Sequence, residues 1–182
     1  MFDVKFEIER KCCWTYDLSK KFKGRFISHI TFRLSKGSTS DILHIHQNNN
    51  SEFPSIIKFI KKHPIVYKLD LMYQDNKNLY LQVYSNVSKI RSMIGTINNY
   101  GAFLFKPITL KDGYEICTIT IPNKDNLPSL IDELKKCGRF KLLSIKKFDN
   151  GVRQNRYVKL KSKNIQITSL LIGQKFQITS NL

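Results

Sequence analysis

The feature that most constrains the fold of this chain is an internal repeat. Residues 54–62 align without gaps on residues 128–136, and the register persists to Asp75 in the first copy and Asp149 in the second. The offset is 74 residues, a length that suits one supersecondary block copied twice rather than a short solenoid repeat. The chain is therefore predicted to carry two similar blocks, each with a helix followed by a strand.

Both copies have the pattern of an amphipathic helix. A proline, Pro54 or Pro128, falls in the first turn, where a missing amide hydrogen costs little. A third helix is predicted near residues 90–97 and a short one at 17–22. The apolar positions of the two repeated helices follow the i, i+3, i+4, i+7 spacing of a buried helix face: Phe53, Ile56, Ile57 and Ile60 in one, Leu127, Leu130, Ile131 and Leu134 in the other.

Segments of alternating apolar and polar residues surround these helices and predict half-buried strands. Residues 41–110 then read strand, helix, strand, strand, helix, strand, which is the order of a ferredoxin-like sandwich. Residues 1–40 and 111–150 supply the elements of a second unit. The predicted fold is α+β, with two interleaved ferredoxin-like (ACT-like) β-α-β units whose antiparallel sheets carry helices on one face. The same pattern also permits a single larger antiparallel sheet backed by three helices.

The chain is strongly basic, with 31 Lys and Arg against 14 Asp and Glu and a formal charge of +17. Such a charge attracts polyanions, nucleic acid above all. The alternative explanation for the many lysines is the base composition of the gene. The chain is rich in Lys, Ile and Asn and has a single alanine, as expected of an AT-rich genome.

Residues 151–182 differ in character from the rest and are predicted to be a basic tail or the remnant of a C-terminal module. Residues 153–163 contain no acidic residue. Their cations can replace counterions on phosphates, and the tyrosine among them can stack on a base; a solvated tail is the alternative. The predicted nucleic-acid contacts are Arg153, Arg156, Tyr157, Lys159, Lys161 and Lys163.

The sequence shows neither a signal peptide nor an apolar run near the 18 or so residues of a membrane span. The four cysteines lack the spacing of a secreted disulfide framework. We therefore expect a cytoplasmic protein with reduced thiols and no membrane contact.

Catalytic and phosphate-binding motifs are missing from the sequence, so we expect no enzyme activity and no cofactor. His44 and His46 stand two apart on a predicted strand and share one of its faces. With the adjacent Cys12 and Cys13 they are candidates for thiol or metal sensing. The alternative is that the histidines belong to a sheet face and the cysteines are small residues at a strand end, and no resident metal is predicted.

Several local patterns resemble the N-terminal part of archaeal regulators of the bacterio-opsin-activator type. They are residues 11–15 (Lys-Cys-Cys-Trp-Thr) followed by Leu18 and Phe22, and the pairing of residues 53–64 with 112–148. The resemblance covers residues 2–150 and implies a sensory region placed before a DNA-binding helix-turn-helix. That module needs roughly fifty residues after position 148, so we expect it to be missing from this chain, which ends at Leu182.

The predicted function is that of a non-catalytic, transcription-regulator-like protein that supplies sensing or protein contact. DNA, a small-molecule effector and a second copy in a homodimer are the expected partners. Two alternatives stay open. One is an RNA-binding or RNA-processing protein with paired ferredoxin-like units, similar to CRISPR RNA endonucleases; the other is a stand-alone dimerisation or ligand-binding module.

Overall fold

The computed structural model of the protein describes residues 1–35, 37–88 and 91–147. Within these residues the strands are β1 (Phe2–Glu9), β2 (Arg25–Ser35), β3 (Ser38–His46), β4 (Val66–Gln74), β5 (Asn78–Asn86), β6 (Phe103–Leu104), β7 (Ile108–Lys111), β8 (Tyr114–Ile121) and β9 (Arg139–Lys147). The helices are α1 (Trp14–Lys21), α2 (Phe53–Lys61), α3 (Met93–Asn99) and α4 (Leu127–Lys135), with a 3₁₀ turn at Lys124–Asn126.

All the described strands join one sheet. Its order is β4-β5-β3-β2-β7-β8-β1-β9, with β6 paired to β8. Every strand pair is antiparallel. The chain is therefore a mixed α+β protein with an antiparallel sheet and four helices in its described part, which confirms the α+β part of the prediction.

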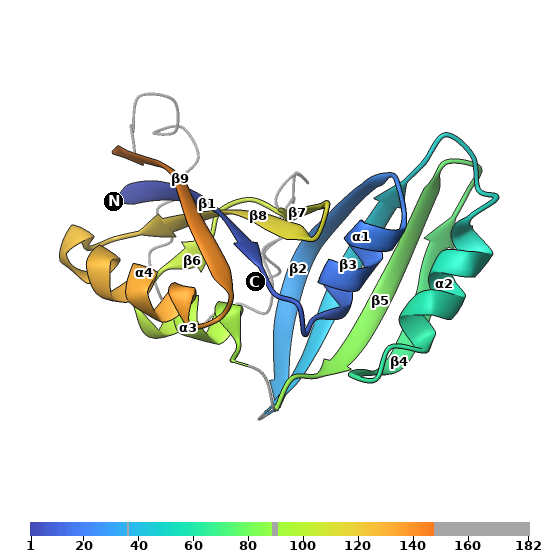
Figure 1. The fold of residues 1–182 in the computed structure, drawn as a ribbon, viewed down its shortest axis with the longest axis horizontal. Helices are drawn as coiled ribbons and strands as arrows, with labels where there is room; N and C mark the ends of the chain where they lie inside the picture. Colours follow the sequence, from blue (N-terminus) through green and yellow to red (C-terminus); the bar gives the residue numbers. More distant parts are fainter. Residues whose placement is uncertain (36, 89–90, 148–182) are drawn as a thin grey trace, which may run out of the picture. The chain divides into compact units, whose positions relative to one another are not determined.

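The two repeated helices have equivalent positions relative to the sheet. Helix α2 connects β3 to β4, and β5 lies between those two strands; helix α4 connects β8 to β9, and β1 lies between them. Each helix thus crosses over a strand that comes from elsewhere in the chain (Figure 1). The repeat seen in the sequence corresponds to these two split crossovers.

The apolar stripe of each crossover helix and the alternate residues of the strand that it crosses are buried in one core. Leu79, Leu81 and Val83 of β5 are fully buried, as are Phe53, Ile56 and Ile60 of α2. In the other half, Val4, Phe6 and Ile8 of β1 are buried together with Leu127, Leu130 and Leu134 of α4. Burial of this kind is the main stabilising term of such a domain.

Helices α1 and α3 begin at residues other than those that the sequence predicts. Helix α1 begins at Trp14, three residues before the predicted start. Helix α3 begins at Met93 because Ser92 caps it: the Ser92 hydroxyl accepts a hydrogen bond from the amide of Gly95 at 3.0 Å. An N-cap of this kind ends the preceding extended segment and fixes the first helical turn.

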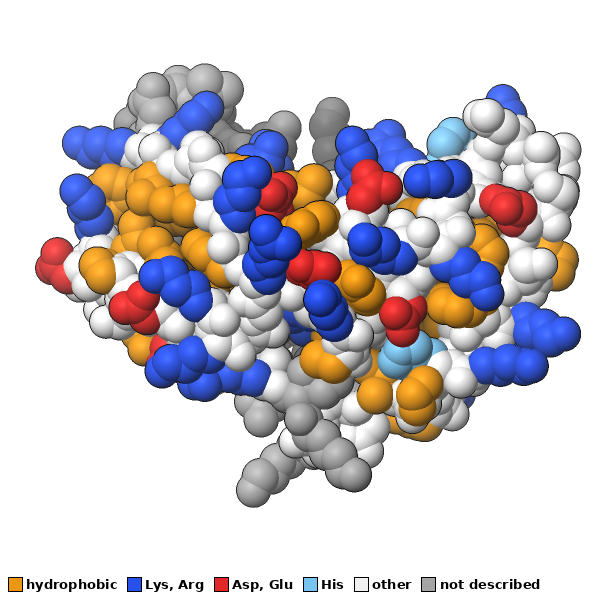
Figure 2. Space-filling model, in the orientation of Figure 1, with side chains coloured by type: hydrophobic (Ala, Val, Ile, Leu, Met, Phe, Trp, Pro, Cys, Tyr) orange, Lys and Arg blue, Asp and Glu red, His pale blue; other side chains and the backbone are white. Residues whose placement is uncertain are grey.

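Positive charge is spread over the side of the sheet that carries the helices. Figure 2 shows Lys and Arg side chains over both halves of this side, with Asp and Glu side chains between them. No single stripe of one sign is visible on that face. No helix of the described residues is both long enough and apolar enough to cross a membrane.

Gly138, between α4 and β9, is required by a close approach of two backbones. A Cβ at this position would collide with the carbonyl oxygen of Glu9 and lie 3.1 Å from Cγ of Arg10. We expect Gly138→Ala to lower the free energy of unfolding by about 1–3 kcal/mol, because backbone must move to make room. Urea denaturation measures this change. Gly95→Ala, in α3, is the control, since a Cβ there meets only the side chain of Ser92, and an equal loss in both variants would contradict the explanation.

Candidate functional site

A small cavity with a mixed polar and apolar lining lies where the two halves of the described sheet meet. Its volume is about 50 Å³, room for a few water molecules or a ligand group of similar size. Residues of β2, β3, β5, β8, α1 and α3 contribute to its wall. The polar lining residues are Arg10, Thr15, Ser28, Thr31, Thr39, Asp41, Ser85, Arg91, Ser92 and Glu115.

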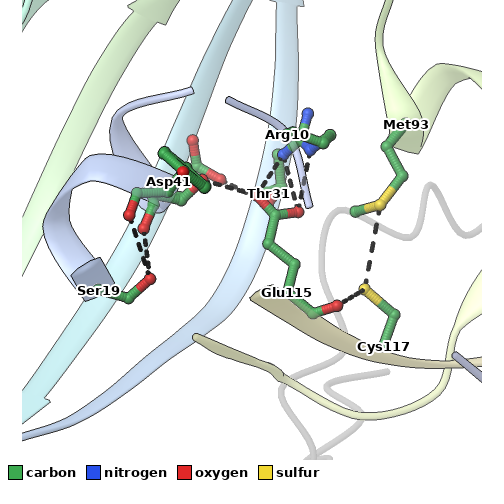
Figure 3. A network of polar contacts seen from close by, with 9 residues as sticks. Arg10, Ser19, Thr31, Asp41, Met93, Glu115 and Cys117 are labelled. Carbon is green, nitrogen blue, oxygen red and sulfur yellow. Dashed lines mark hydrogen bonds and ion pairs between the residues drawn. The ribbon is translucent and has the colours of Figure 1, made fainter. Parts of the chain in front are cut away.

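An ion pair between Arg10 and Glu115 closes one side of the cavity (Figure 3). Nη2 of Arg10 lies 2.6 Å and 2.8 Å from the two carboxylate oxygens of Glu115, and the hydroxyl of Thr15 donates to the same carboxylate at 2.6 Å. The side chains are 15% and 3% exposed. Burial is the largest single effect and lowers the pKa of Arg10, but the charge and hydrogen bonds of Glu115, together with the nearby cysteines, raise the pKa above its ordinary value, so Arg10 stays charged. The pair is neutral as a unit and internally satisfied.

Asp41 supplies a second carboxyl, which has fewer hydrogen-bond donors around it than Glu115 has. It pairs with Thr31 across β2 and β3, and the Thr31 hydroxyl donates to Asp41 Oδ1 at 2.6 Å. Burial raises the pKa of Asp41 to about 6, although the hydrogen bond from Thr31 acts in the opposite direction. Figure 3 shows Asp41 and Thr31 beside the Arg10–Glu115 pair. A carboxyl with this pKa exchanges its proton in the physiological range.

Two serine hydroxyls face the same cavity without a hydrogen-bond partner among the described residues. They are Ser28 Oγ and Ser85 Oγ, in residues only 4% and 1% exposed. A buried hydroxyl left unsatisfied costs about 1–3 kcal/mol, so each needs a partner that the described side chains do not provide. The cavity therefore offers the Asp41 carboxyl and these two hydroxyls to a guest, among its other polar lining residues.

Stability should depend on pH through Asp41. Because folding raises its pKa above the ordinary value of 3.8, the folded state holds the proton more tightly. Stability is therefore greatest below pH 4 for this group and falls as the pH rises to about 6. We expect Asp41→Asn to remove this fall and to be more stable than the wild type at pH 8 by roughly 1–2 kcal/mol.

Urea unfolding at pH 5 and pH 8 tests the role of Asp41. Thr31→Val is the matched variant: it removes the hydrogen bond that lowers the pKa of Asp41, so the fall in stability should shift to higher pH. If Asp41→Asn keeps the pH dependence of the wild type, another group is responsible.

The two candidate cysteines lie at the start of α1 and differ in environment. Cys12 is exposed and Cys13 is buried. Burial raises the pKa of Cys13 to about 12, despite the opposing charge of Arg10. Since the thiolate is the form that binds metals and reacts with oxidants, Cys13 is poorly suited to either task at neutral pH.

The two candidate histidines lie on β3 and share one hydrogen-bond partner. His44 Nε2 and His46 Nδ1 are each 3.0 Å from Oδ1 of Asn78. Among residues 1–35, 37–88 and 91–147, no group of three or more His, Cys, Asp or Glu is placed to hold a metal ion. The structure thus brings the histidines together with Asn78, but does not form a metal cluster from them and the cysteines.

The predicted nucleic-acid contacts lie outside the described residues. They are Arg153, Arg156, Tyr157, Lys159, Lys161 and Lys163.

Sequence reasoning missed the cavity residues, although one signal was available. Glu115 interrupts the inward, apolar positions of β8, where Cys117, Ile119 and Ile121 follow at intervals of two. Asp41 similarly precedes Leu43 and Ile45 in β3. A charged residue is rarely buried in a protein unless it is paired with another group.

One comparison with known proteins identifies a family. A family model described as HVO_2525_N, N-terminal, matches residues 3–140, a range that includes Arg10, Asp41 and Glu115. No curated protein matches the chain significantly. Because the match covers most of its length, the chain belongs to the HVO_2525_N, N-terminal family.

Proposed function

We propose that the chain is a non-catalytic sensing domain of a transcription-regulator-like protein, and that a small polar effector binds in the cavity. The observation that carries this proposal is the pair of buried hydroxyls, Ser28 and Ser85, that line the cavity without a partner in the described structure. The regulatory part rests on the resemblance of residues 2–150 to regulators of the bacterio-opsin-activator type.

The lining groups favour a guest that donates hydrogen bonds. The Asp41 carboxylate accepts them, and a serine hydroxyl both accepts and donates. Arg10 and Glu115 already satisfy each other, so they form a wall rather than a free charge. A compound of about four heavy atoms that bears an ammonium or hydroxyl group fits both the chemistry and the volume.

The position of the cavity suits a sensor. Its wall draws on β2, β3 and β5 from one half of the sheet and on β8 and α3 from the other. A guest that contacts both halves stabilises the arrangement that it bridges, and a ligand shifts an equilibrium only through such differential contacts.

The fold proposed for this function is a pair of interleaved ferredoxin-like (ACT-like) units. The sequence predicts one unit at residues 41–110 and a second from residues 1–40 and 111–150, but the strand order favours another division. One unit then comprises β2, β3, β4 and β5 with α1 and α2, and the other comprises β1, β7, β8 and β9 with α3 and α4. The connections β1-α1-β2 and β5-α3-β7 then pass from one unit to the other. Strand order and the two split crossovers support this assignment.

Ethanolamine is a suitable first probe of the cavity, because it carries an ammonium and a hydroxyl group. We expect millimolar ethanolamine to raise the unfolding temperature of the full chain, and Ser85→Ala to weaken its apparent affinity about tenfold, the value of one hydrogen bond. Acetate, of the same size but only an acceptor, is the control and should have no effect. If ethanolamine acts equally on wild type and Ser85→Ala, it does not bind in the cavity.

DNA contact is proposed for the basic segment at residues 153–163. Between residues 150 and 182 the sequence has no acidic residue to offset its cations. We expect a chain that ends after Asn150 to bind duplex DNA more weakly, with a shallower salt dependence, since each lost phosphate contact reduces the slope of log K against log salt by about 0.9. Fluorescence anisotropy at several salt concentrations measures both. Unchanged affinity would refute the assignment.

A homodimer through the edge strand β9 is also proposed. Leu142, Leu143 and Ile145 of β9 are 39%, 40% and 44% exposed, and hydrophobic side chains gather in the part of Figure 2 where β9 and α4 lie. An exposed apolar edge is a template for pairing with another chain. We expect Leu143→Lys to convert a dimer to a monomer in light scattering, whereas Leu71→Lys, on the opposite edge β4, should not.

A further inference from the structure

The face of the sheet opposite α1 and α2 carries a row of aromatic rings. His29 of β2, His44 of β3, Tyr80 of β5 and Tyr73 of β4 follow one another across four adjacent strands. Ring centroids are 5.7 Å apart for His29 and His44, 4.2 Å for His44 and Tyr80, and 6.1 Å for Tyr80 and Tyr73. The rings of His44 and Tyr80 are nearly parallel, at 4°.

A second group of rings continues the same face along β5 and β4. Tyr84, four residues after Tyr80 and thus on the same side of β5, lies 6.2 Å from Tyr67, and the ammonium of Lys68 sits 4.6 Å above the Tyr84 ring. We call these six aromatic residues, together with Lys68, the aromatic face. Its members are His29, His44, Tyr67, Tyr73, Tyr80, Tyr84 and Lys68.

This face is open in the described structure. The inward residues Leu43, Ile45, Leu79 and Leu81 of the same strands are fully buried. Of the outward rings, Tyr67 is 59% and Tyr73 54% exposed. His44, Tyr80 and Tyr84 are half-buried between their neighbours. Rings gathered in one exposed patch mark an interaction site more often than scattered rings do.

The arrangement of the rings is held in place before any partner arrives. Asn78 accepts hydrogen bonds from both His44 and His46, and the hydroxyl of Tyr73 donates to Asp75 at 3.2 Å. Groups that are already ordered lose little entropy on binding, which favours a platform for flat ligands.

Charge indicates which flat ligand the face fits. Of the 31 Lys and Arg residues, 25 precede residue 148, against 13 of the 14 acidic residues, so the excess of positive charge does not depend on residues 151–182 alone. Lys68 lies on the face, and Arg25, exposed at the start of β2, is the strand partner of His46. Lys68 also pairs with Asp70 at 2.7 Å.

We propose that the aromatic face binds single-stranded nucleic acid. Unpaired bases stack on aromatic rings with little sequence preference, and each stack contributes about 1–3 kcal/mol. A four-stranded sheet with aromatic rings on its open face can stack two or three bases. The exposed rings of Tyr67 and Tyr73 and the outer edge of Tyr80 would contact bases, while Lys68 and Arg25 would contact phosphates. This activity is independent of the cavity and of duplex DNA contact by residues 153–163.

Fluorescence anisotropy with labelled twelve-residue oligo-uridine and oligo-thymidine tests the proposal on the full chain. We expect Tyr80→Ala to weaken binding of both strands at least fivefold, and Tyr80→Phe to bind like the wild type, because stacking needs the ring and not the hydroxyl. Phe103→Ala is the matched control: Phe103 is 47% exposed on β6, away from this face. A preference between the two oligonucleotides would tell RNA from DNA as the partner.

Three results would overturn the proposal. Tyr80→Ala could bind both single strands as tightly as the wild type. Phe103→Ala could lose as much affinity as Tyr80→Ala, which would make the loss unspecific. Tyr80→Ala could instead turn a dimer into a monomer while the wild type binds neither strand, which would assign the face to a second copy of the chain. Binding of a twelve-base-pair duplex should be unchanged in Tyr80→Ala, and this separates the aromatic face from the DNA contact proposed above.

Discussion

Replacing Glu115 by alanine is expected to lower the free energy of unfolding by about 3–5 kcal/mol, because it leaves the buried Arg10 guanidinium without a counter-charge. Glu115 is 3% exposed and accepts three hydrogen bonds from Arg10 and one from Thr15. The pair also connects the segment after β1 to β8, 105 residues later. Loss of Glu115 therefore removes a link between distant parts of the chain as well as a charge.

Urea denaturation followed by circular dichroism measures the effect of Glu115→Ala. The double variant Arg10→Met with Glu115→Leu is the control, since an apolar pair of similar size often matches a buried ion pair in stability. We expect the double variant to recover most of the loss. If it is no more stable than Glu115→Ala, packing rather than an uncompensated charge explains the effect.

Phe53→Ala is expected to cost about 3–5 kcal/mol, the usual range for a large side chain removed from a core. Phe53 is 0% exposed at the start of α2 and belongs to the same buried core as the inward residues of β5. The cavity left by the ring cannot fill because neighbouring Ile56 and Ile60 are themselves fully buried. Thermal and urea unfolding should both report the loss.

Two further variants place the Phe53 result in context. Phe103→Ala, at a position 47% exposed, should change stability by less than about 1 kcal/mol, as expected of surface sites. Leu127→Ala, at the start of α4 and therefore the counterpart of Phe53 in the repeat, should cost about 2–5 kcal/mol. If Phe53→Ala lowers stability and Leu127→Ala does not, α4 contributes little to the stability of the core.

Local regularities in the sequence account for the parts of the structure that were predicted well. The 74-residue repeat and the spacing of Ile56, Ile60, Leu130 and Leu134 predicted α2 and α4, and all four side chains are buried as that spacing requires. Alternation of apolar residues likewise predicted the strands. Such patterns suffice because a helix face or a strand face is decided by neighbours within a few residues.

The sequence by itself thus determined the fold class, the two crossover helices and the basic character of the chain. Only the tertiary structure decided which strands became neighbours: β1 between β8 and β9, β5 between β3 and β4. That choice brought together Arg10 with Glu115, and Ser28 with Asp41 and Ser85, and it aligned four rings across four strands. The physical reason is that strand order depends on contacts between residues far apart in the chain, which no local period records.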